Sequence, residues 1–157
     1  MTGDVGDLAT DLSRSLRELG RTLQSRRLTA SLHADLSSRL TPTKIHALDV
    51  LAERGDVRIG DLASGLSVDE TSATRLVDRL EQGGLAQRRP QEGDRRVTLV
   101  SLTPAGRRLA AAIDARRREF FADVLAALEP DERAELVRLM EKATEAVRAR
   151  SEELVGR

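Results

Sequence analysis

The sequence has no cysteine, tryptophan or tyrosine, and only two phenylalanines and two histidines among its 157 residues. Without cysteine, a disulfide framework, a thiolate zinc site and a cysteine redox switch are excluded. His33 and His46 are the only imidazoles, too few to predict zinc, so polar surface positions are the favoured interpretation for both. Neither a catalytic Ser, His and Asp set nor a glycine-rich phosphate loop is present. We therefore expect no enzyme activity, no cofactor and no metal.

Long apolar runs and a charge bias are also missing. Apolar residues make up 39% and charged residues 33% of the chain, and no run is long enough to cross a bilayer. The N-terminus shows no secretory signal, so we expect a soluble cytoplasmic protein. The 26 basic and 26 acidic residues cancel, so any nucleic-acid interface must depend on local charge.

Both ends of the chain predict long amphipathic helices. The first runs from about Asp4 into the twenties and continues, as one helix or two in near line, to about Arg39. Two more begin at Thr103-Pro104 and after Pro130. The first stripe of apolar residues, spaced three and four apart, is Val5, Leu8, Leu12, Leu16, Leu19 and Leu23. With few aromatics to fill a core, such helices would bury little in a monomer, so we expect a homodimer.

Between these ends, local signals predict a helix-turn-helix. Thr41 is a good N-cap, proline follows it, and Gly55 is a suitable stop for the second helix. A short helix is expected at residues 61–66. Ser67 and Glu70 have capping-box spacing and predict the start of the next helix, which ends at the glycines 83–84. Two helices joined by so tight a turn, the second with a polar outer face, are typical of a DNA-binding motif.

A β-hairpin is predicted directly after these helices. Residues 85–89 and 96–102 favour strands, and residues 90–94 (PQEGD) have the chemistry of a turn. A hairpin in this place is a wing.

Several motifs in register resemble the MarR family of transcriptional regulators. Residues 71–106 read TSATRLVDRLEQGGLAQRRPQEGDRRVTLVSLTPAG. They are similar to the family's recognition helix, its L-x-x-x-G-L exit, its wing with an Asp-x-Arg motif, and the L-T-x-x-G start of the next helix. Upstream, LTPTKIHALDVLAERG and IGDLASGLSVDE resemble the second and third helices. Gly60 departs from the pattern, because a better N-cap often stands there.

The resemblance implies a mainly α fold with a small β-hairpin wing. Residues 41–104 would form a winged helix-turn-helix DNA-binding lobe, and residues 1–39 and 105–157 a helical dimerisation lobe within one MarR-type domain.

The outward face of the second motif helix supplies the expected base contacts, with Arg75 favoured for guanine. For Arg79 we favour an ion pair with Asp78 or Glu81. The resemblance makes Asp94 and Arg96 the Asp-x-Arg motif, whose acid orients an arginine toward DNA. The expected helix contacts are Thr71, Ser72, Thr74, Arg75 and Arg79; the wing contacts are Arg88, Arg89, Asp94, Arg95 and Arg96; and the phosphate contacts are Thr43 and Lys44.

The resemblance also implies a small aromatic or phenolic effector between the two lobes, near His33, Leu36, His46 and Phe120. The predicted function is a DNA-binding regulator, a homodimeric repressor of a pseudo-palindromic operator in double-stranded DNA. Two alternatives remain open. One is an activator, or a ligand-independent regulator, of the same fold; the other is a winged-helix protein-interaction module without specific DNA binding.

Overall fold

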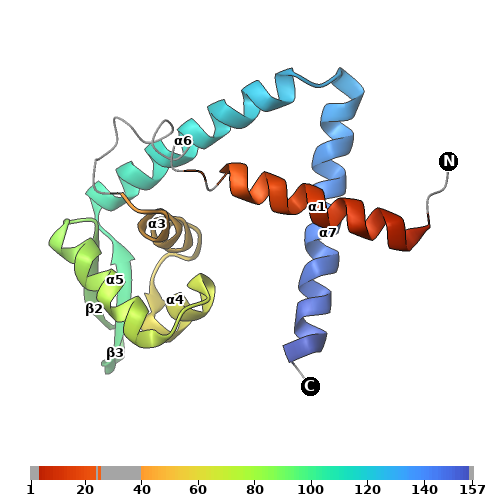
Figure 1. Cartoon of the computed structure of the whole chain (residues 1–157). Helices are drawn as coiled ribbons and strands as arrows, with labels where there is room; N and C mark the ends of the chain where they lie inside the picture. The colour runs from red at the N-terminus through yellow and green to blue at the C-terminus, as the bar shows by residue number, and fades with distance from the viewer. Residues whose placement is uncertain (1–3, 24, 26–39, 156–157) are drawn as a thin grey trace. The chain divides into compact units, whose positions relative to one another are not determined.

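The computed structural model describes residues 4–23, 25 and 40–155, without the side chains of Arg95 and Arg96. The predicted helical continuation over residues 26–39 therefore lies outside the described residues. The chain divides into two units, residues 1–116 and 117–157. Its elements, coloured in chain order in Figure 1, are α1 (Val5–Leu23), α3 (Pro42–Arg54), β1 (Val57–Arg58), α4 (Ile59–Leu66), α5 (Glu70–Gln82), β2 (Ala86–Gln91), β3 (Asp94–Leu102), α6 (Pro104–Ala126) and α7 (Pro130–Val155).

The predicted limits of α3 are confirmed. Thr41 is its N-cap, and the Thr41 hydroxyl oxygen accepts a hydrogen bond of 3.3 Å from the backbone N–H of Lys44. Gly55 ends the helix with φ of 74°, in the region that glycine adopts at little cost. Both signals are local, which is why the sequence alone identified them.

The predicted start of α5 at Ser67 is wrong. Ser67 instead ends α4 in the left-handed conformation, with φ of 55°. Asp69 is the N-cap of α5, and its carboxylate accepts hydrogen bonds from the backbone N–H of Ser72 at 2.8 Å and from the Ser72 hydroxyl at 2.7 Å. Both Ser67 and Asp69 are good capping residues; the tight turn after α4 places the second of them at the helix start.

The wing belongs to a three-stranded antiparallel sheet with strand order β1-β3-β2. Val57 of β1 pairs with Val100, which also pairs with Arg88 of β2. The hairpin turn is shorter than predicted, because Pro90 and Gln91 continue β2 and only residues 92–93 remain between the strands. Pro90 is tolerated there because β2 is an edge strand.

One apolar core joins the helices α3, α4 and α5 to the sheet and to the first turns of α6. The inward-facing apolar residues of the two motif helices are all buried: Leu62, Ala63, Leu66, Ala73, Leu76, Val77 and Leu80. The largest fully buried side chains are Leu48, Leu51, Leu62, Val77, Leu80, Val100 and Ile113. This core holds the helix-turn-helix and the wing in one body.

The end of α5 and the start of α6 meet at a close backbone contact. The Thr103 hydroxyl donates to the carbonyl of Gly84 at 2.6 Å and accepts from the N–H of Gly106 at 3.0 Å. The Thr103 N–H donates to the carbonyl of Leu85 at 3.0 Å. A Cβ atom at position 106 would lie 1.9 Å from that same carbonyl oxygen. Only glycine fits at this position.

Both terminal helices carry stripes of large, exposed apolar side chains. On α1 they are Val5, Leu8, Leu12, Leu16 and Leu19; on α7 they are Leu136, Val137, Leu139, Met140, Val147 and Leu154. Searching the described residues finds no helix with the length and apolar content of a membrane span.

Candidate nucleic-acid interface

Helix α5 presents the polar face that the sequence predicted. Ala73, Leu76, Val77 and Leu80 are buried against the core. The five predicted contact residues, Thr71, Ser72, Thr74, Arg75 and Arg79, are all exposed. The helix therefore offers hydroxyl and guanidinium donors on one accessible side, as a major-groove reader requires.

Arg75 and Arg79 of α5 have exposed side chains. Among the residues that the structure describes, neither side chain has a hydrogen-bond or ion-pair partner. The expected ion pair of Arg79 with Asp78 or Glu81 is therefore wrong, because another arginine occupies both acids. Within the described part of the chain, both guanidinium groups are therefore exposed and unpaired.

That other arginine is Arg88, which we expected to contact DNA from the wing. Its Nη2 lies 2.8 Å from Oδ1 of Asp78, and its Nη1 pairs with Oε2 of Glu81. Its own backbone N–H donates to Oε1 of Glu81 at 2.8 Å, and Nη2 also reaches the carbonyl of Thr74 at 3.4 Å. The Arg88 side chain thus contacts the recognition helix, where its single positive charge offsets part of the negative charge of Asp78 and Glu81.

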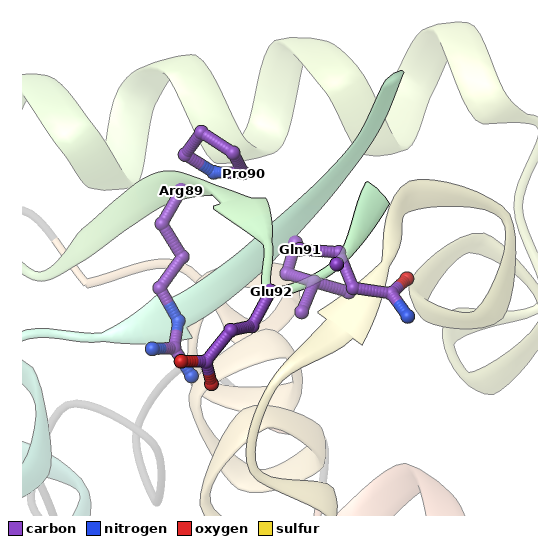
Figure 2. A pocket seen from close by; sticks show the side chains of 6 residues that line it. Arg89, Pro90, Gln91 and Glu92 are labelled. Atoms are coloured by element: carbon purple, nitrogen blue, oxygen red, sulfur yellow. The ribbon is translucent and has the colours of Figure 1, made fainter. Parts of the chain in front are cut away.

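Arg89, the next residue of β2, pairs with Asp56 in the turn between α3 and β1. Arg58 of β1 donates to Oε1 of Gln91 at 3.2 Å. Figure 2 shows Gln91 extending toward β1 while the side chains of Arg89 and Glu92 extend together to another side of the wing. Arg89, Gln91 and Glu92 are among the residues that line an open hollow of about 650 Å³. Two polar contacts therefore join β2 to β1 and to the turn before it, across the central strand β3.

The Asp69 cap fixes the first turn of the recognition helix. The hydrogen bonds from Ser72, first its hydroxyl and then its backbone N–H, lower the pKa of the Asp69 carboxyl below its ordinary value. The Ser72 hydroxyl donates its proton to Asp69, so toward a ligand it can act only as an acceptor. The sequence missed this cap, although Asp69 and Ser72 have N-cap and N3 spacing.

The remaining predicted contacts lie on α3 and β3. Thr43 is exposed in the first turn of α3, and Lys44 is half-buried there. Asp94 begins β3. The backbones of Arg95 and Arg96 continue that strand, and their side chains lie outside the described residues.

Of the expected effector residues, His33 and Leu36 lie outside the described part of the chain. His46 is exposed on α3. Phe120, on α6, makes an edge-to-face contact with Phe121 at 5.3 Å between ring centres. Residues 4–23, 25 and 40–155 contain no group of three His, Cys, Asp or Glu suited to a metal ion.

Comparisons with known proteins agree with this architecture. Residues 40–98 match the sequence model of the MarR family. An HTH-type transcriptional regulator of Mycobacterium bovis is 34% identical over 80% of this chain and 82% of its own length. The HTH-type transcriptional repressor MdtR of Bacillus subtilis is 27% identical over 88% of this chain and 87% of its own.

Solved structures share the fold. A MarR family protein from Bacillus stearothermophilus is 25% identical with a TM-score of 0.79, covering 93% of this chain and 99% of that one. Streptococcus pneumoniae FabT, solved in complex with DNA, is 19% identical with a TM-score of 0.71, covering 96% and 99%. Bordetella bronchiseptica BpsR, whose DNA binding 6-hydroxynicotinic acid regulates, is 23% identical with a TM-score of 0.62, covering 85% and 98%.

The helix-turn-helix, the three-stranded wing and the two long C-terminal helices agree with these relatives along most of the chain. They are regulators, not enzymes. The chain belongs to the MarR family of winged helix-turn-helix, DNA-binding transcriptional regulators.

Proposed function

We propose that the chain is a homodimeric repressor that binds a pseudo-palindromic operator and is released from it by a small-molecule effector. The observation that carries this proposal is the exposed face of α5, where Arg75 and Arg79 have no partner in the described chain while the neighbouring Asp78 and Glu81 are paired with Arg88. Such a face attracts phosphates and offers forked donors to guanine O6 and N7.

In this proposal, α5 lies in the major groove with Thr71, Ser72, Thr74, Arg75 and Arg79 near the bases. The wing tip, with Asp94, Arg95 and Arg96, lies in the flanking minor groove, whose negative potential favours arginine. Thr43 and Lys44, at the start of α3, bind phosphates. Arg88 and Arg89 form ion pairs with acids of the chain and stabilise the interface without contacting DNA.

The exposed stripes of α1 and α7 support the homodimer. Large apolar side chains on one face of a helix need a partner surface, and a second copy of the same helices supplies one. The dimerisation lobe would then comprise residues 1–39 and 105–157, and the DNA-binding lobe residues 41–104. Two recognition helices would enter successive major grooves about 34–36 Å apart.

Repression and effector release draw support from relatives of the chain. MdtR is a repressor, and a fold neighbour, BpsR, has its DNA binding regulated by a hydroxylated aromatic acid. A dimer on a promoter represses by occlusion. An effector near His33, Leu36, His46 and Phe120 would release DNA only if it binds the DNA-incompetent arrangement of the lobes more tightly than the competent one.

The test begins with a duplex selected by the purified protein from a random pool and with DNA upstream of its own gene. Fluorescence anisotropy over a salt series then compares these duplexes with random DNA, for the wild type and Arg96→Ala. We expect selective, salt-sensitive binding that weakens in the variant. A reporter promoter carrying the duplex should be silenced. Equal, weak binding to every duplex would favour a protein-interaction module instead.

A further inference from the structure

Arg88 holds the two DNA-binding elements of the lobe together. It belongs to β2 of the wing, yet its side chain contacts Asp78 and Glu81 of α5. Its side chain is 28% exposed, whereas that of the adjacent Arg89, paired with Asp56, is 53% exposed. Neither Asp56 nor any other described partner of Arg89 belongs to the recognition helix. Two neighbouring arginines on one strand therefore have different structural surroundings.

We propose that Arg88 is a positioning residue: it fixes the recognition helix against the wing and so determines sequence selectivity without contacting DNA. This role rests on the DNA-binding function proposed above and assigns its sequence selectivity in part to Arg88. Selectivity depends on holding base-reading side chains within a fraction of an ångström of their productive geometry. The guanidinium and the backbone N–H of one residue act together here, because both bind the Glu81 carboxylate.

The geometry favours positioning over a phosphate contact. A guanidinium that already spans two carboxylates would have to leave both of them to bind DNA, and each departure would expose an acid to the phosphates. Coulomb repulsion would then oppose binding. A planar fork can reach two acids and the Thr74 carbonyl at once, whereas the point charge of lysine cannot match that geometry.

The decisive variant removes the acids and keeps the arginine. Asp78→Asn combined with Glu81→Gln preserves side-chain shape and makes α5 more positive by two charges. If Arg88 is a positioning residue, binding to random DNA strengthens while the ratio of selected to random affinity falls by about tenfold, the loss that one misread base pair causes. If Arg88 is a phosphate contact, the freed guanidinium strengthens binding to every duplex and the ratio is unchanged, which would overturn the proposal.

Substitutions of Arg88 itself test the same point with a matched control on the same strand. Arg88→Gln and Arg88→Lys should both lower the affinity ratio, the lysine variant less, with the slope against salt unchanged. Arg89→Gln removes the same charge from the next position and should lower both affinities together, leaving the ratio unchanged. An Arg88→Gln variant that keeps the wild-type ratio, or that reduces the salt slope by about one, contradicts the proposal.

Two measurements keep these outcomes separate from other failures. Thermal unfolding followed by circular dichroism shows whether each variant is folded at the assay temperature; if Arg88→Gln is not, the Arg88→Lys and Asp78→Asn/Glu81→Gln variants decide. The selection experiment on the wild type tests the proposed function independently. If no duplex is enriched, the proposed function is contradicted. If one is enriched and the affinity ratio is unchanged in every variant of Arg88, Asp78 and Glu81, only the proposed role of Arg88 is contradicted.

Discussion

At the scale of single residues, the interface contains arginines of two kinds that composition does not distinguish. Arg75 and Arg79 have no partner among the described residues, whereas Arg88 and Arg89 are paired with acids. The sequence located all four, because helical periodicity identifies the outer face of α5 and strand propensity identifies the wing. It did not predict the ion pair of Arg88 with Asp78, because that contact crosses the turn at the glycines 83–84 and no local rule measures that distance.

The Asp69 cap predicts a pH dependence of folding. Its pKa is lowered in the folded protein by the hydrogen bonds from Ser72. The contribution to stability is therefore fully present above the unfolded pKa, near the ordinary value of 3.8, and is lost as the pH falls through the folded pKa, which lies below that value. Urea unfolding at pH 7 and in steps toward pH 3 should show wild type losing more stability than Asp69→Asn, which caps without titrating. Equal losses would contradict this role of the carboxylate.

At the scale of elements, local sequence signals were sufficient to predict a helix end where that end depends only on residues next to it in the chain. Thr41 and Gly55 were predicted at the ends of α3 for that reason. Pro90 was misassigned to the turn because its place in an edge strand depends on the strand order β1-β3-β2, which includes a strand from before α4. Ser67 and Asp69 are both suitable N-cap residues for α5. The turn between α4 and α5 includes Ser67 and places Asp69 at the N-cap.

The contact between the end of α5 and the start of α6 predicts that position 106 accepts only glycine. Gly106→Ala would place its methyl group 1.9 Å from the Leu85 carbonyl oxygen, and relieving that clash should cost about 1–3 kcal/mol of unfolding free energy. Gly20→Ala is the matched control, because a methyl group at that position of α1 meets no atom within 4 Å. It should stabilise the helix by up to about 1 kcal/mol. Equal effects in urea unfolding would refute the close contact.

At the scale of the whole molecule, the fold class and most helix limits followed from the sequence, since long stripes and caps carry strong signals. The sequence predicted a partner for the exposed stripes of α1 and α7 without identifying the contacts between two copies. Those contacts depend on surfaces of another chain, which periodicity does not describe.

Dimerisation through these stripes predicts a specific sensitivity of α1. Leu12, which is 57% exposed in the single chain, should become buried in the dimer, so Leu12→Glu would place an unpaired charge in an apolar interface. Sedimentation equilibrium should show a shift toward monomer. Thr10→Glu, on the opposite side of the same helix, should leave the dimer intact. A dimer of unchanged affinity in Leu12→Glu would exclude α1 from the interface.

The most direct measurement of the central claim, that α5 reads the major groove from each half of a dimer, is dimethyl sulfate protection of guanine N7 on the selected duplex. The account predicts two protected patches about 10–10.5 base pairs apart, or a multiple of that spacing. In Arg75→Ala, one guanine should lose protection in each patch, with binding weakened by about 1–3 kcal/mol per contact. Uniform protection, or two patches unchanged by Arg75→Ala, would contradict it.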